Sequence, residues 1–147
     1  MLAASEPPDN YRYYTTAAPQ CPFPDAYLGS VINAVPFDAV FVQFCPLSHV
    51  SPRMKTADTI LDNNYCSLPQ FSNPNSWNFG QWDNWAKTAS PNKNVKVYIG
   101  APAAPGAANP GYYVDAATLG NIAVQTRNQY SSFGGIMLWD ASQAYGE

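Results

Sequence analysis

The fold is decided by the stretch FDAVFVQF, residues 37–44, because it is almost continuously apolar. A strand with one solvated face alternates apolar and polar residues, whereas a strand buried on both faces of a parallel sheet does not. Three further stretches are rich in β-branched or aromatic residues, which favour strands: RYYTTAA at 12–18, NVKVYIG at 94–100 and FGGIMLW at 133–139. The sequence therefore predicts four strands, with the last also buried.

Helical patterns separate these strands. Apolar residues recur at helical spacing in residues 25–35, and residues 80–88 form a short helical stretch with two Trp. Asp115 is a suitable N-cap for a helix that runs to about residue 130. Alternating strands and helices favour parallel strands joined by right-handed crossovers. We therefore expect an α/β fold: half of a TIM (βα)₈ barrel with its helices outside, or a small open sheet. In both, ligands meet the carboxyl ends of the strands.

Composition limits the function classes. The 147 residues suffice for one domain, and the seven Lys and Arg are scattered in a chain of net charge −3, which argues against nucleic-acid binding. No apolar stretch is long enough to span a bilayer, and residues 1–10 lack the basic and apolar regions of a signal peptide. Aromatic residues make up 14% of the chain, which fits either a sugar-binding surface or an aromatic-rich core.

Few residues could act as catalysts. The two Glu, Glu6 and Glu147, lie near the termini, and only Asp140 directly follows a predicted strand. A two-carboxylate hydrolase needs two acids close together, and no such pair is evident. We expect Asp140 to be a structural loop residue, although an open α/β enzyme that uses it as a lone acid stays an alternative. The single His, His49, falls in a segment without periodicity, and we predict no catalytic residue.

The chain also lacks a recognisable cofactor or metal site. Its three Cys and one His match no zinc spacing, and its glycines match no phosphate-binding loop, so we expect neither metal nor cofactor. An odd number of Cys leaves at least one thiol unpaired or pairs it between chains. Trp139, at the end of a strand, is the best binding candidate. Its ring could stack on a sugar or could be a core residue beneath the last loop.

Taken together, the motifs resemble glycoside hydrolase family 18, specifically the class III chitinases of plant and fungal type. The matching stretches are TAAPQCPFPD at 16–25, FDAVFVQF at 37–44, NNYC at 63–66, VYIGAPAA at 97–104 and GGIMLW at 134–139. The resemblance covers about residues 13–145 and leaves residues 1–10 as an unmatched leader. It implies that the four strands are β5 to β8 of the family's barrel. It also implies a parent enzyme that hydrolyses β-1,4-N-acetylglucosamine polymers with retention, the substrate's own acetamide acting as nucleophile.

Two departures from the family pattern affect the expected activity. The family's general acid ends the motif Asp-x-x-Asp-x-Asp-x-Glu on β4, and no such motif occurs here. The family also reads Val-Gln-Phe-Tyr-Asn-Asn where this chain has residues 45–62 in place of the Tyr that assists the acetamide. We hypothesise that residues 45–62 are a translated intron, because splicing within the Cys45 codon and at the Leu61–Asp62 boundary would restore a Tyr codon in frame. The chain is expected to be inactive as written.

The resemblance also implies site residues and partners. Gln43, Asn63 and Trp139 would contact the sugar, and Cys21 and Cys66 would form a disulfide between the loops after two neighbouring strands. The expected partner is chitin or a chitooligosaccharide, and open strand edges could allow self-association. The parent family is extracellular. The alternative function is that of a non-catalytic carbohydrate-binding module or decoy.

Overall fold

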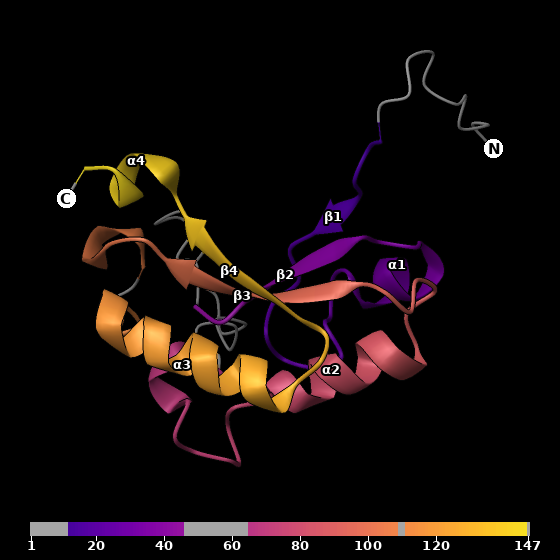
Figure 1. Cartoon of the computed structure of the whole chain (residues 1–147), viewed down its shortest axis with the longest axis horizontal. Coiled ribbons are helices and arrows are strands. Elements are labelled where there is room, and N and C mark those ends of the chain that lie inside the picture. Colours follow the sequence, from indigo (N-terminus) through magenta and orange to yellow (C-terminus); the bar gives the residue numbers. More distant parts are fainter. Residues whose placement is uncertain (1–11, 46–64, 109–110, 147) are drawn as a thin grey trace, which may run out of the picture.

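The computed structural model describes residues 12–45, 65–108 and 111–146. They form one sheet of four parallel strands, and each strand pairs with its neighbours in the sequence, in the order β1-β2-β3-β4 (Figure 1). The predicted parallel α/β architecture is therefore confirmed. The strands are β1 (Thr16–Ala17), β2 (Ala39–Gln43), β3 (Lys96–Pro102) and β4 (Phe133–Trp139).

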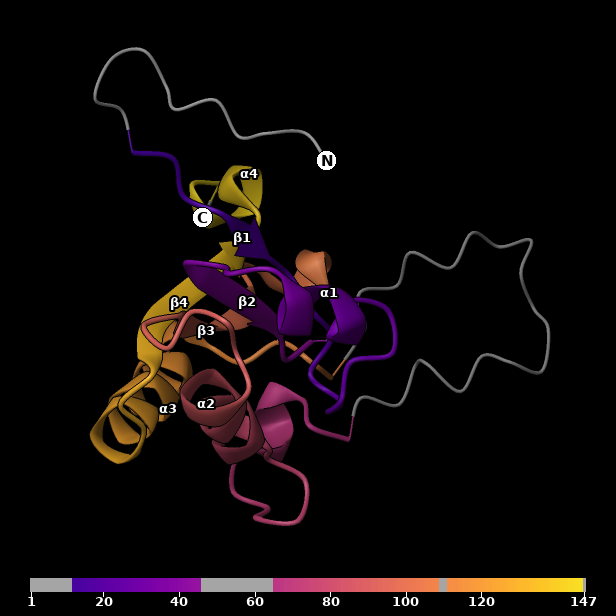
Figure 2. The same cartoon turned by 90° about the vertical axis from the view of Figure 1, so that its right-hand side faces the viewer.

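Helices connect these strands. α2 and α3 lie together on one side of the sheet, below it in Figure 1, and the same arrangement is seen in the rotated view of Figure 2. A sheet whose neighbours are consecutive in sequence and joined by right-handed crossovers keeps its connecting helices on one face. The helices are α1 (Gly29–Ala34), α2 (Phe79–Thr88), α3 (Ala116–Gln129) and α4 (Ala141–Ala144), with short 3₁₀ turns at Leu68–Gln70 and Pro105–Ala107. Within the described ranges no helix is both long and apolar enough to cross a membrane.

The core lies between the sheet and these helices. Alternate residues of β2 and β3 are buried completely and belong to one cluster with side chains of all three longer helices. The cluster includes Val40, Val42, Val97, Ile99, Ile32, Trp82, Leu119 and Ile122. Because strand residues alternate in direction, the residues between them point to the opposite face of the sheet. That second face carries Phe41 beside Tyr98 and Gln43 beside Gly100.

Two predicted elements are shorter than expected. The strand predicted over residues 12–18 is confined to Thr16–Ala17, at the edge of the sheet. The helix predicted from residue 25 begins at Gly29. The reason is Asp25, whose carboxylate accepts hydrogen bonds from the backbone N–H groups of Tyr27 and Leu28 and holds a turn ahead of the helix. By contrast, Asp115 caps α3 as predicted, accepting from the backbone N–H of Thr118 at 2.9 Å.

Candidate functional site

A pocket of about 570 Å³ lies at the carboxyl ends of β2, β3 and β4, where a parallel sheet is expected to hold its ligand. Its floor and walls come from the face of the sheet opposite the three longer helices. The lining is mostly apolar and consists of Ala18, Phe41, Gln43, Cys45, Gly100, Ala101, Met137, Leu138, Trp139, Asp140 and Ala141. Two of the three predicted sugar contacts, Gln43 and Trp139, therefore line one pocket.

Trp139 forms part of the wall of this pocket. It ends β4 opposite Pro102, and its backbone C=O accepts a hydrogen bond from Ala103 N at 2.8 Å. The residue is 45% exposed, so it is not a core Trp beneath the last loop. The peptide bond that follows it, to Asp140, is cis. A partly exposed indole beside an apolar floor is suited to stacking against a flat ligand.

Gln43 is partly buried at the end of β2, and its amide is held at both atoms. Nε2 donates to the backbone C=O of Ala18 at 2.6 Å, and Oε1 accepts from Nε2 of Gln20 at 3.1 Å. The backbone of Gln43 also bridges to the segment after β1, since its N–H donates to Pro19 O at 2.8 Å. The side chain is thus fixed in place at the edge of the pocket.

Glycine is required on the pocket floor at one position. A Cβ built on Gly100 would lie 2.7 Å from the backbone oxygen of Val42 and 3.3 Å from Cε of Met137. Met137 and Phe41, which the sequence analysis did not single out, are also pocket residues. The strand period could have identified them, because each lies two positions before a predicted contact, Trp139 or Gln43. Cys45 is another missed pocket residue, and the same period could have indicated it, because it lies two positions after Gln43.

Asp140 lies in the pocket wall, but its carboxylate is occupied by hydrogen bonds within its own segment of chain. It caps α4, accepting from Gln143 N at 3.2 Å and from the hydroxyl of Ser142. These hydrogen bonds, first that from Ser142, hold the pKa of Asp140 below its usual value. A general acid needs a pKa near the working pH, so this carboxylate is unsuited to donate a proton at neutral pH. The geometry favours the structural reading of Asp140.

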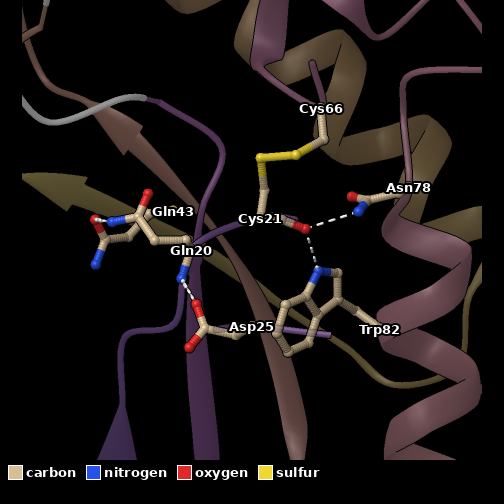
Figure 3. The surroundings of a disulfide bond; sticks show 7 residues. All are labelled: Gln20, Cys21, Asp25, Gln43, Cys66, Asn78 and Trp82. Atoms are coloured by element: carbon tan, nitrogen blue, oxygen red, sulfur yellow. Dashed lines mark hydrogen bonds between the residues drawn. A yellow bond between two sulfur atoms is a disulfide. The ribbon is translucent and has the colours of Figure 1, made fainter. Parts of the chain in front are cut away.

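The predicted disulfide is present and lies beside the pocket. Cys21 and Cys66 are bonded, with Cα atoms 6.0 Å apart, and both are completely buried (Figure 3). The backbone C=O of Cys21 accepts two hydrogen bonds, from Asn78 Nδ2 at 2.7 Å and from Trp82 Nε1 at 3.0 Å. The disulfide therefore ties the segment after β1 to the stretch just before the 3₁₀ turn Leu68–Gln70, and the two hydrogen bonds tie the same segment to the start of α2.

Three sequence predictions fall wholly or largely outside the described residues. They are the position of Asn63, the insert predicted over residues 45–62, of which only Cys45 is described, and the leader predicted over residues 1–10. Among the residues that the structure describes, no three His, Cys, Asp or Glu side chains gather as metal ligands.

Comparison with known proteins reveals several relatives. A "Chitinase 2" of Rhizopus oligosporus is 49% identical over 129 residues, which is 88% of this chain and 20% of the relative. A "Class III chitinase" of Arthroderma benhamiae is 43% identical over 138 residues, covering 90% of this chain and 36% of the relative. The chain thus spans between a fifth and about a third of these relatives' length. No family model matches.

Solved structures agree with these relatives. The chitinase ICChI from Ipomoea carnea has a TM-score of 0.58 at 32% identity and covers 90% of this chain and 40% of that protein. The xylanase and alpha-amylase inhibitor protein XAIP-II from Scadoxus multiflorus has a TM-score of 0.59 at 30% identity and covers 92% and 45%. The resemblance to class III chitinases of glycoside hydrolase family 18 is confirmed.

Proposed function

We propose, from its similarity to class III chitinases, that this chain supplies part of the sugar-binding wall of a chitinase-type site. The ligand is a β-1,4-linked N-acetylglucosamine polymer, and the contacts are Gln43, Asn63 and Trp139. The observation that carries this proposal is the shared pocket of Gln43 and Trp139 at the carboxyl ends of the strands. An apolar floor with one exposed indole and one fixed amide suits a sugar ring, which has an apolar face and polar edges.

The barrel assignment is part of the same proposal. In a doubly wound sheet the strand order reverses at a switch point. Here the order β1-β2-β3-β4 does not reverse, as in a (βα)₈ barrel, where every strand neighbours its successor. We assign β1 to β4 of this chain to β5 to β8 of the family barrel, which puts the pocket at the barrel's catalytic end.

The 147 residues taken alone are proposed to bind without hydrolysing. They contain no Asp-x-x-Asp-x-Asp-x-Glu motif. Among the described residues, the acidic one that lines the pocket is Asp140, and its hydrogen bonds as a helix cap favour the ionised form. Hydrolysis of chitin is accordingly an activity of a chain that also carries the family's acid.

A binding titration with chitooligosaccharides, run beside a hydrolysis assay, tests this proposal. Binding without turnover supports it, and Trp139→Ala should weaken that binding about fivefold, because a stacked indole contributes on the order of 1 kcal/mol. The matched control is Tyr27→Ala, since Tyr27 is 64% exposed and lines no part of the pocket. Failure of the folded chain to bind, or turnover by the wild type, contradicts it.

A non-catalytic carbohydrate-binding or decoy role is the second candidate. It is favoured by the similarity to XAIP-II, whose name describes an inhibitor of xylanase and alpha-amylase and not a chitinase. The two candidates differ in what a complete chain does. If a transcript of the gene encodes the acid motif in frame ahead of residue 1, the enzyme reading holds. If transcripts lack it, the binding role is favoured.

The origin of residues 45–62 is also a proposal: they are a retained intron. Sequencing of spliced transcripts should find most messages without this segment and with a Tyr codon between Phe44 and Asn63. A mature message that keeps the segment at high abundance would contradict it. The buried disulfide Cys21–Cys66 supports a further assignment, to the extracellular space, because such bonds persist in oxidising compartments.

Self-association through the outer edge of β4 is proposed for the isolated chain. Leu138 on this strand is 46% exposed, and in the described part of the chain the outer edge pairs with no strand. Lys on an edge strand opposes such pairing. Sedimentation should therefore detect oligomers that Leu138→Lys reduces, whereas Val124→Lys on α3, 49% exposed, leaves them unchanged. A monomeric wild type would refute the idea.

A further inference from the structure

The segment after β1 holds the amide of Gln43 in one orientation. Gln43 Nε2 donates to Ala18 O at 2.6 Å, and Gln43 Oε1 accepts from Gln20 Nε2 at 3.1 Å (Figure 3 shows the two glutamines side by side). Rotating the amide by half a turn would set oxygen against oxygen at Ala18 and NH₂ against NH₂ at Gln20. Both contacts therefore oppose a flip.

Gln20 is itself well anchored. Its backbone N–H donates to Asp25 Oδ2 at 2.8 Å, and its backbone forms an isolated parallel bridge with Gln43. The next residue, Cys21, is fixed by the disulfide to Cys66 and by the hydrogen bonds that its C=O accepts from Asn78 and Trp82. Gln20 thus connects a rigid, buried framework to a side chain in the pocket wall.

We infer that Gln20 is a positioning residue that acts through Gln43. An amide carries two N–H donors and two acceptor lone pairs. With one N–H given to Ala18 and one lone pair to Gln20, Gln43 offers a ligand one donor and one acceptor at fixed places. The inference rests on the proposed function only for the nature of the ligand, a sugar whose acetamide or hydroxyl groups pair with that amide.

Variants at position 20 separate hydrogen bonding from packing. Gln20→Glu is nearly isosteric but, when ionised, has no side-chain donor for Gln43 Oε1. Gln20→Lys changes the end group yet keeps a donor at similar length. If Gln20 positions Gln43 through its hydrogen bond, Gln20→Glu should lose the fixed orientation of the Gln43 amide, and Gln20→Lys should keep most of it. If Gln20 acted only through packing, the result would be the reverse. The nearly isosteric Gln20→Glu would behave like the wild type, and Gln20→Lys would be the defective variant.

The first readout needs no ligand. In ¹⁵N-labelled full chain, the two side-chain amide protons of Gln43, assigned with Gln43→Glu, should be well separated and exchange slowly with water. Gln20→Glu should bring them together and raise their exchange rate severalfold, while Gln20→Lys keeps the wild-type pattern. Gln125→Glu, on the exposed surface of α3, is the matched control and should change nothing. An unaltered Gln43 signal in Gln20→Glu overturns the inference, whatever the chain binds.

The second readout uses chitotetraose. Losing a positioned hydrogen bond should weaken binding by Gln20→Glu about fivefold to tenfold, with Gln20→Lys close to wild type and thermal stability unchanged in both. Equal binding by Gln20→Glu and wild type also overturns the inference. If the wild type does not bind, the proposed function fails, and the amide signals of Gln43 still decide the role of Gln20.

Discussion

The ring of Tyr98 occupies the space that a side chain at Gly134 would need. A Cβ built on Gly134 would lie 2.4 Å from Cε2 of Tyr98 and 2.8 Å from Cβ of Lys96. The strand register shifts at this point, because Val97 pairs with Phe133 whereas Tyr98 pairs with Gly135. Gly134 is thus the extra residue of a bulge over which the ring of Tyr98 lies.

Replacing this glycine should destabilise the chain. We expect Gly134→Ala to lower the free energy of unfolding by about 1–3 kcal/mol, because the ring and strand must move to admit a methyl group. Denaturant unfolding measures the change. Gly120→Ala, inside α3 with nothing within 4 Å of the new Cβ, is the control and should be neutral or stabilising. An equally stable Gly134→Ala would show that the strand adapts freely.

Loss of the disulfide should lower the free energy of unfolding by more than Gly134→Ala does. Cys21 and Cys66 are 45 positions apart, and closing a loop of this length lowers the entropy of the unfolded chain by the equivalent of about 4 kcal/mol. The wild type should therefore unfold at a clearly lower denaturant concentration when reductant is present. The double variant Cys21→Ser with Cys66→Ser should match the reduced wild type and show no response to reductant. An unchanged unfolding midpoint on reduction contradicts the expectation.

Asp83 should make stability depend on acid pH. Burial raises the pKa of this carboxyl, but hydrogen bonds from Lys87 Nζ at 2.5 Å and from Ser132 N at 3.0 Å outweigh it, so the net pKa is lowered. A lowered pKa in the folded state gives stability that is present above the unfolded value of about 3.9 and is lost as pH falls through the folded value. Stability measured against pH should show this loss.

The matching variant is Asp83→Asn. We expect it to be less stable than wild type by about 1–3 kcal/mol at neutral pH, because it loses the ion pair with Lys87 and weakens the bond from Ser132. The gap should narrow below about pH 4, where the wild-type carboxylate also protonates. Asp115→Asn, which changes an exposed helix cap, should lower the free energy of unfolding at neutral pH by less than Asp83→Asn does. A gap for Asp83→Asn that stays constant with pH would exclude this origin.

Cys45 should be inert in the folded chain. It is the free thiol of the structure, 2% exposed, and burial raises its pKa to about 11. Thiolate is the reactive form, so a thiol reagent at pH 8 should label the folded protein very slowly. In denaturant, with the disulfide intact, one equivalent should react at once. Rapid labelling of the folded chain would show that Cys45 is accessible.

The sequence predicted the positions of three strands well because their apolar runs are long. The stretches at 37–44, 94–100 and 133–139 each contain or closely match an observed strand. The expectation that the last strand is buried was wrong, because β4 ends the described sheet and each of its residues is partly or largely exposed. It failed where a side chain redirects the backbone, as Asp25 does ahead of α1, and where an element is too short to show a period, as with α4. Periodicity also could not reveal the bulge at Gly134, since that depends on contact with a distant Tyr98.

The candidate site was predicted in part, because a strand-end position can be read from local sequence whereas contacts between distant residues cannot. Position at a strand end indicated Trp139 and the family resemblance added Gln43, and the structure gathers both in one pocket. The hydrogen bonds that fix Gln43 involve Ala18 and Gln20, more than twenty residues away in sequence. Such long-range pairs depend on how two strands are aligned, which no local pattern encodes.

The uninterrupted strand order also has a consequence during synthesis on the ribosome. Each strand that emerges finds its partner already made, because β2 pairs with β1, β3 with β2 and β4 with β3. The sheet can therefore lengthen at one growing edge as translation proceeds, without waiting for a distant strand to return. In a chain built in this way the growing edge stays open to other nascent chains only until the next segment leaves the exit tunnel and covers it.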